Sequence, residues 1–270
     1  MLQAIHIWNV MINFTRLRTF VVLSAIVISL GLHGAGAQAP KSARKAVLIE
    51  LFTSEGCSTC PPADELLSHL RQEKFADGLD IIPLALHVDY WNSQGWKDRF
   101  SAADYTQRQQ KYAQKFGLKD LYTPQMVVDG SAQVTGNDTP SVRQSISHAA
   151  LRPQSAEIQI SAAANKLLVS VKAAETAAGT VMLALTEDNL MTKVGAGENG
   201  GRELHHSAVV RKLQPLGQLQ KGSFETSVPL KLRKDWKRED MRIVVFVEEP
   251  SSGQIEGAAV LAVPLSPTAP

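Results

Sequence analysis

The only two cysteines of the chain, Cys57 and Cys60, are separated by two residues. They follow an apolar run, Ala46–Phe52, that is typical of a buried strand, and they precede a predicted helix that opens with Pro61 and Pro62. A helix N-terminus presents unpaired N–H groups and the positive end of the helix dipole, and both stabilise a thiolate. The spacing predicts that Cys57 attacks a substrate disulfide and that Cys60 resolves the mixed disulfide. An inert disulfide and metal binding are the alternatives.

Two titratable side chains, His87 and Asp89, lie at the carboxyl end of the next predicted strand, Leu79–Val88. The carboxyl ends of parallel strands share one edge of a sheet, where ligands bind, so we expect both near Cys57. His87 either stabilises the Cys57 thiolate as an imidazolium or donates to a loop carbonyl as a structural residue. A hydrolase built from Cys57, His87 and Asp89 is a weaker hypothesis, because the neighbouring Cys60 would oxidise the nucleophile outside the cell.

Aromatic and histidine pairs elsewhere have less specific roles. Trp91 and Trp96 either form an apolar wall for a peptide substrate or pack their loop against the protein. His205 and His206 are neighbours in the chain, and on a strand adjacent side chains point to opposite faces, so the two cannot both chelate one ion without a bulge. We expect an exposed or loop-structural role for them. The Gly195–Gly201 segment is no phosphate loop, because no Lys-Ser/Thr pair follows it.

The elements that position Cys57 alternate between strand and helix over residues 45–152. The predicted order is β-α-β-α-β-β-α, which right-handed crossovers assemble into a small sheet with helices on both faces. Pro83 inside the second strand indicates a bulge or an edge position, because proline cannot donate to the ladder. The predicted strands are Ala46–Phe52, Leu79–Val88, Gln125–Val128 and Ser131–Val134, and the predicted helices begin near Cys60, Ser101 and Thr139.

The pattern changes in residues 155–265, where short alternating segments are separated by Gly, Pro and polar clusters. Seven such segments predict an antiparallel β-sandwich of immunoglobulin-like type. The fold class is therefore α/β plus all-β. The expected strands are Ile158–Ser161, Leu167–Ala173, Val181–Thr186, Ser207–Leu213, Phe224–Leu230, Ile243–Val247 and Ala258–Val263.

The order of elements in residues 45–152 resembles the thioredoxin fold. In that superfamily a cis-proline faces the cysteine pair, and the backbone before it pairs with substrate. The resemblance implies that Pro124 is this proline and that Thr123 is the residue facing the disulfide. Glu50 resembles the buried acid that relays a proton to the resolving thiol in thioredoxins, although its register is one residue off.

Four segments resemble the exported bacterial family called domain of unknown function 1223. They are ELFTSEGCSTCPPADELL (50–67), HVDYWNSQGWKDRF (87–100), YTPQMVVDG (122–130) and GENGGRELHHSAVVR (197–211). The resemblance implies a secreted thioredoxin-like domain joined to a β-rich domain, and it supplies no activity. The sequence departs from thioredoxins at Gly56, where they have Trp, and at Ser58 and Thr59, where they have Gly and Pro. Because these positions tune the redox potential, the redox direction stays open.

Composition and charge exclude several classes of protein. A chain of 270 residues with 44% hydrophobic and 20% charged residues is globular.

Residues 1–37 form a predicted signal peptide. Arg16 and Arg18 precede its apolar run, and it ends in Ala-Gly-Ala at Ala37. Translation could start at Met1 or Met11. Removal of the signal peptide changes the charge from 28 − 26 = +2 to 26 − 26 = 0. A neutral chain gives no electrostatic argument for a nucleic-acid or membrane partner.

These observations predict an exported thiol–disulfide oxidoreductase, periplasmic or secreted, that acts on protein or peptide thiols together with an unknown redox partner. It needs no dissociable cofactor, and we expect no membrane span after signal cleavage. Two alternatives remain open. Cys57, Cys60 and His87 suit Cu(I) binding or metal delivery. In the second alternative, the chain is a binding module in which the disulfide only stabilises the first domain.

Overall fold

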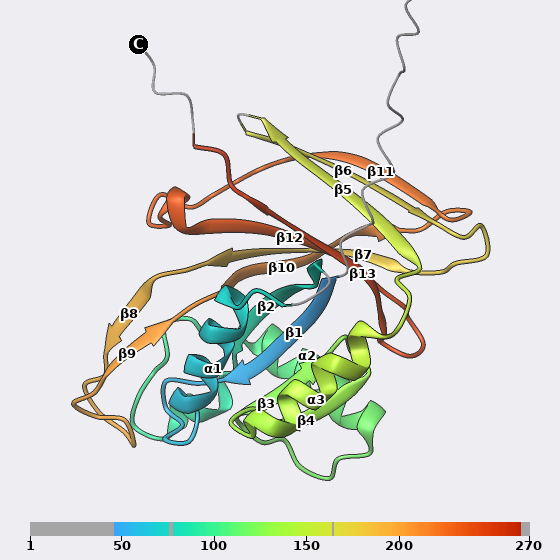
Figure 1. Cartoon of the computed structure of the whole chain (residues 1–270). Helices are drawn as coiled ribbons and strands as arrows, with labels where there is room; N and C mark the ends of the chain where they lie inside the picture. Colours follow the sequence, from blue (N-terminus) through green and yellow to red (C-terminus); the bar gives the residue numbers. More distant parts are fainter. Residues whose placement is uncertain (1–45, 76–77, 164, 266–270) are drawn as a thin grey trace, which may run out of the picture. The chain divides into compact units, whose positions relative to one another are not determined.

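The computed structural model describes residues 46–75, 78–163 and 165–265, and the predicted signal peptide lies outside them (Figure 1). None of the helices in these residues is long and apolar enough to cross a membrane. The elements up to residue 150 are β1 (Ala46–Thr53), α1 (Pro61–Gln72), β2 (Asp80–His87), the 3-10 helix η2 (Tyr90–Ser93), α2 (Ala103–Phe116), β3 (Gln125–Val128), β4 (Ala132–Thr135) and α3 (Thr139–Ala150).

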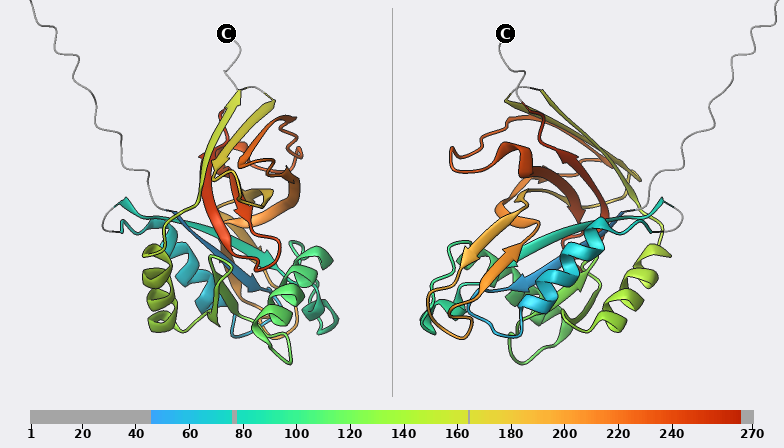
Figure 2. Two further views of the ribbon diagram at one scale, coloured as in Figure 1. Left: turned by 90° about the vertical axis from the view of Figure 1, so that its right-hand side faces the viewer. Right: turned by 60° about the vertical axis from the view of Figure 1, so that its left-hand side comes forward.

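This part of the chain has the predicted β-α-β-α-β-β-α order. β1 runs parallel to β2 and antiparallel to β3, and Thr53 lies opposite His87, so β1 and β2 end at the same edge. Helices α1 and α3 cover one face of the sheet and α2 covers the other (Figure 2). β1 is buried along its whole length because both faces of the sheet are covered. Ile49 and Leu51 pack toward α1 and α3, whereas Leu48 and Phe52 pack toward α2.

The second half contains more strands than the sequence predicts. All seven predicted strands form, and a short hairpin of β8 and β9 is added. The elements are β5 (Ala156–Ala163), β6 (Lys166–Ala173), β7 (Thr180–Glu187), β8 (Leu190–Lys193), β9 (Glu203–His206), β10 (Val209–Gln218), β11 (Ser223–Pro229), the 3-10 helix η3 (Arg238–Asp240), β12 (Met241–Glu248) and β13 (Ile255–Ala262).

One sheet runs through both halves, in the strand order β13-β12-β7-β10-β2-β1-β3-β4. The two halves join where β10 lies parallel to β2, and the N–H of Ala85 donates to the carbonyl of Ala208. Because backbone groups alternate along β2, the nitrogen of Pro83 points to the same side as the N–H of Ala85, toward β10. The only residue of β2 that pairs with β10 is Ala85, so no strand of the described residues lies opposite Pro83 on that side. Pro83 therefore occupies an edge-like position and interrupts no ladder.

The strands β11, β6 and β5 form a second layer. Apolar side chains of β5 and β6 pack against those of β7 and β12, so the second half is a two-layered β structure. The fold is therefore mixed α/β plus β, as predicted. One of the two layers, however, is continuous with the first half, and all described residues belong to one compact unit. The division into domains at 45–152 and 155–265 stays a prediction, with its boundary on the segment between α3 and β5.

The candidate redox site

Cys57 and Cys60 lie between the end of β1 and the start of α1, as predicted. They form a disulfide, and Cys60 is the residue that precedes the first turn of α1. The N–H of Cys57 donates to the carbonyl of Ser54, and the N–H of Cys60 donates to that of Cys57, so the loop is a succession of tight turns. Both cysteines are fully buried, whereas Ser58 and Thr59 between them are exposed. The Thr59 hydroxyl lies 3.4 Å from the Cys57 Sγ.

The loop between β8 and β9, from the second half of the chain, contacts the cysteine turn. Asn199 is fully buried and donates its amide to two carbonyls, those of Glu55 and Cys57, at 2.9 Å each. Glu198 accepts from the N–H of Ser58 at 3.0 Å. No role for this glycine-rich loop could be predicted from its residues, and the structure places it against the cysteine turn.

Thr123 and Pro124 lie close to the start of α1. Their peptide bond is cis, as the thioredoxin resemblance implies. A Cβ added to Gly136 would lie 3.1 Å from the Cβ atoms of both Pro124 and Ala63, so Pro124 approaches the first turn of α1. The indole of Trp91 donates to the Thr123 hydroxyl at 2.8 Å.

The tryptophans pack the loop after β2 against the cysteine turn. The Cβ of Trp91 lies 3.2 Å from the position that a Cβ on Gly56 would take. Trp91 therefore occupies space beside the residue where thioredoxins carry their own Trp. The indole of Trp96 donates to Glu55 at 2.8 Å. Of the two predicted roles, these contacts favour packing.

His87 is fully buried, and its Nδ1 lies 2.6 Å from Asp98 rather than from Asp89. Asp89 instead accepts from the hydroxyl of Thr106 on α2. His87 and Asp89 therefore do not form the His–Asp pair that a Cys-His-Asp hydrolase would need. Burial opposes the ionisation of Asp98, yet the charge and hydrogen bond of His87 and two backbone N–H groups hold its pKa at about 2. Burial lowers the pKa of His87, but the carboxylates around it, Asp98 first, raise it above its ordinary value.

Glu50 lies on the other face of the sheet, toward α2. Its carboxylate accepts from Arg108 and from the hydroxyl of Tyr112, and Arg108 also binds Glu248 of β12 at 2.8 Å. The structure therefore does not bring Glu50 to the cysteine pair, which lies at the start of α1. Its carboxylate already has a cation and a hydroxyl as partners, which favours an ion-pair role over the proposed proton relay.

His206 is buried, and this corrects the expectation of an exposed or loop-structural role. On β9 the side chains alternate as expected: His205 is exposed and pairs with Glu203, whereas His206 points inward. His206 Nε2 lies 3.4 Å from Glu55 Oε1, and its ring centroid lies 5.0 Å from that of His87. We call the buried titratable group around it the histidine–carboxylate cluster. Its members are Glu55, Asp64, His87, Asp98 and His206.

Asp64 connects this cluster to the first turn of α1. Its carboxylate accepts from the Thr53 hydroxyl at 3.2 Å, and its N–H donates to the carbonyl of Cys60 at 3.1 Å. Burial raises the pKa of Asp64, while the charges of His206 and His87 partly offset that effect. The sequence signal for Asp64 was its place four residues after Cys60, and nothing in the spacing distinguished it from an ordinary first-turn acid.

Comparison with known proteins identifies the family. The family model described as "Protein of unknown function (DUF1223)" matches residues 48–248. The chain belongs to the DUF1223 family. A crystal structure of a protein from Agrobacterium tumefaciens, a structural genomics target, is similar with a TM-score of 0.68 at 25% sequence identity, over 82% of this chain and 95% of that one.

A second solved structure is more distant. A domain of the outer membrane lipoprotein Omp28 from Porphyromonas gingivalis matches with a TM-score of 0.24 at 15% identity, over 43% of this chain and 93% of that one, and it carries no argument. No curated protein matches.

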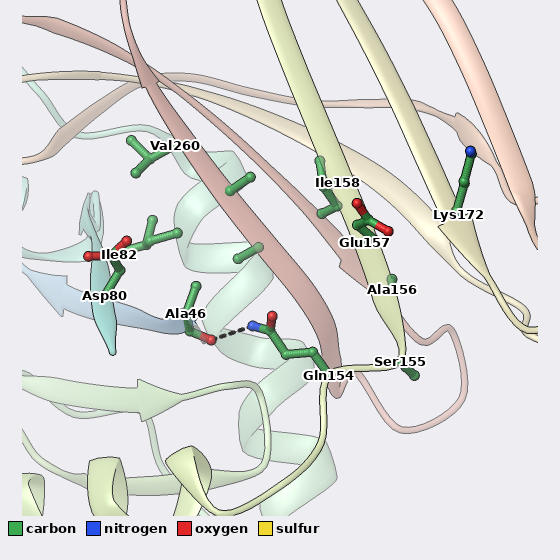
Figure 3. A pocket seen from close by; sticks show the side chains of 12 residues that line it. Ala46, Asp80, Ile82, Gln154, Ser155, Ala156, Glu157, Ile158, Lys172 and Val260 are labelled. Carbon is green, nitrogen blue, oxygen red and sulfur yellow. Dashed lines mark hydrogen bonds between the residues drawn. The ribbon is translucent and has the colours of Figure 1, made fainter. Parts of the chain in front are cut away.

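The DUF1223 chain also has a pocket far from the cysteines, at the amino ends of β1 and β2 (Figure 3). Its volume is about 480 Å³, and its lining includes Ala46 and Ile82 together with the charged Asp80, Glu157 and Lys172. Because β1 runs from Ala46 toward the cysteine turn, this pocket lies at the opposite edge of the sheet. Among the described residues, no three His, Cys, Asp or Glu side chains are placed to hold a metal ion.

The low pKa of Asp98 predicts an acid-dependent part of the stability of this DUF1223 protein. A carboxyl whose folded pKa is depressed adds stability above its unfolded pKa, and that stability is lost as the pH falls through the folded value of about 2. The difference in unfolding free energy between wild type and Asp98→Asn should therefore shrink by about 2 kcal/mol between pH 5 and pH 2. Urea unfolding at a series of pH values measures it. A difference that stays constant with pH would contradict the His87–Asp98 pairing.

Proposed function

We propose that the protein is an exported thiol–disulfide oxidoreductase that acts on protein or peptide thiols. The observation that carries the proposal is the Cys57–Cys60 disulfide at the junction of β1 and the N-terminus of α1, with Pro124 close to the first turn of that helix. A pair in this position has the stabilised thiolate and the close resolving thiol that disulfide exchange requires.

The arrangement of elements supports a thioredoxin-like first half. β1 and β2 are parallel, β3 and β4 form an antiparallel hairpin, and helices cover both faces. The two layers of the second half support a sandwich, for which we retain the immunoglobulin-like type as part of the proposal. The predicted leader supports export to the periplasm or the medium.

Exchange proceeds in two steps. In the reduced protein the Cys57 thiolate attacks a substrate disulfide, forms a mixed disulfide and releases one substrate thiolate. Cys60 then attacks Cys57 Sγ, which releases the second substrate thiolate and restores the Cys57–Cys60 disulfide. The Thr59 hydroxyl, 3.4 Å from Cys57 Sγ, can donate to the thiolate. Thr123, held by Trp91 beside the cysteine turn, is the residue whose backbone we assign to substrate.

One observation favours a second candidate. Both cysteines are fully buried, which suits a permanent structural disulfide in a binding module. In that case the double variant Cys57→Ser/Cys60→Ser would be less stable and would keep its partner.

The reduction potential of the Cys57–Cys60 pair decides between them. We expect a value between roughly −120 and −270 mV, the range of known exchange catalysts. Equilibration of the purified protein with glutathione or dithiothreitol buffers, followed by quantification of free thiols, measures it. A value below about −300 mV is typical of structural disulfides and would refute the oxidoreductase in favour of the binding module.

A further inference from the structure

Exchange at a buried disulfide moves protons as well as electrons. When an external dithiol reduces the pair, the Sγ–Sγ bond of Cys57 and Cys60 breaks and the two sulfurs gain two electrons. The external dithiol becomes a disulfide and loses two protons. Because both cysteines are fully buried, a thiolate left on the pair is costly unless a positive charge forms nearby. A group that accepts a proton beside the cysteine turn would supply that charge.

The histidine–carboxylate cluster adjoins the cysteine turn on both sides. Glu55 precedes Cys57 by two residues, and Asn199 holds the carbonyls of both. Asp64 follows Cys60 by one helical turn and donates its N–H to the Cys60 carbonyl. The cluster is therefore built on the same backbone segment as the disulfide.

Within the cluster, His206 is the histidine that forms no hydrogen bond to a carboxylate, and its contact with Glu55 is 3.4 Å long. His87 and Asp98 bind each other at 2.6 Å, and Asp98 also accepts from the N–H groups of Glu55 and Phe100. By contrast, both ring nitrogens of His206 and the Oε1 atom of Glu55 are buried and have no hydrogen-bond partner among the described residues. His206 is thus free to take up or release a proton without breaking an existing bond.

We propose that His206, carried by β9, is a positioning residue that holds one of the two protons of the reduced pair, so that Cys57 is a thiolate while Cys60 is a thiol. The proposal rests on the exchange chemistry proposed above. The balance is complete: the two protons of the external dithiol end on Cys60 and on His206, and its two electrons end on the cysteine sulfurs. In the opposite direction His206 returns its proton as the disulfide re-forms.

The charges facing His206 come from several elements. Glu55 lies in the turn after β1, Asp64 on α1, His87 at the end of β2 and Asp98 in the loop after it. Beyond them, the guanidinium groups of Arg99 and Arg211 stack on Phe100, whose ring packs against His206. Of these carboxylates, Glu55 and Asp64 interact with His206 itself, whereas Asp98 is bound to the neighbouring His87.

The test is the pH dependence of Cys57 alkylation in the reduced full chain. The protein is reacted with iodoacetamide between pH 5 and pH 9, and Cys57 modification is located by mass spectrometry. His206→Gln should make alkylation at pH 6 about tenfold slower relative to its rate at pH 9, because the thiolate loses its compensating charge. His205→Gln, the exposed neighbour on the same strand, should match wild type. Identical profiles for all three proteins would overturn the proposal.

A measurement on wild type avoids the risk that His206→Gln fails to fold. The imidazole proton signals of His205 and His206 are titrated by NMR in the oxidised and reduced proteins. The titration midpoint of His206 should rise on reduction, while that of His205 stays constant, and an unchanged midpoint for His206 would overturn the proposal.

Neither the alkylation nor the NMR titration requires a substrate. A potential typical of structural disulfides would therefore refute the proposed function, whereas an exchange-competent potential with an unaffected His206 would refute this inference alone.

Discussion

Serine in place of Cys57 is expected to lower the rate of thiol–disulfide exchange by more than about a thousandfold, as loss of a covalent nucleophile does in other enzymes. Serine keeps the size of the side chain, so the contacts of the turn with Asn199 and Ser54 are retained. What is lost is the thiolate, which no neighbouring group replaces. Reduction of a model peptide disulfide by the reduced protein measures the rate.

The matched variant Cys60→Ala gives the complementary result. It keeps the attacking thiol and removes the resolving one, so mixed disulfides between Cys57 and substrate should accumulate and be visible on non-reducing gels. If Cys57→Ser retains the wild-type rate, or if Cys60→Ala traps no partner in the compartment where the protein acts, Cys57 is not the nucleophile.

Methionine in place of Arg108 is expected to cost about 3–5 kcal/mol of unfolding free energy. Arg108 lies between α2, β1 and β12, where it binds Glu50 through two nitrogens and Glu248 through a third. Glu50 is almost completely buried, so the variant would leave a carboxylate in the core without its cation. Urea unfolding followed by circular dichroism measures the loss.

A surface ion pair supplies the control. Arg143 binds Glu73 through two hydrogen bonds of 2.9 and 2.8 Å, a similar geometry, but both side chains are exposed to solvent. Arg143→Met should cost less than about 1 kcal/mol. The double variant Glu50→Met/Arg108→Met should recover much of the stability lost in Arg108→Met, since the almost completely buried carboxylate of Glu50 is removed together with its cation. Equal losses for Arg108→Met and Arg143→Met would show that burial of Glu50 does not matter.

The sequence predicts the local elements of this protein well. The apolar run of β1 and the two prolines at the start of α1 place Cys57 and Cys60 correctly, because strand and helix boundaries depend on residues close together in the chain. The cis peptide before Pro124 was expected from the resemblance of the element order, and the structure has it.

The sequence does not predict the contacts between distant segments. Asn199 reaches the Cys57 carbonyl across 142 residues, and no spacing rule connects a glycine-rich loop with that turn. His205 and His206 are indistinguishable until the register of β9 decides which one is buried. The partner of His87 was equally uncertain, because Asp89 and Asp98 lie in the same loop region and only the path of the loop brings Asp98 to the ring.

The pairing of β2 with β10 limits how the gene for such a protein can recombine. Leu84 and Leu86 of β2 share one apolar core with Val210 and Phe246 from the second half. A gene cut after α3 would encode a fragment in which β2 is an open edge strand and the core residues that the second half covers are exposed, and such edges cause aggregation. The segment with the cysteine pair and the segment with the β layers therefore cannot be exchanged between genes as independent domains. We expect recombination to transfer them together.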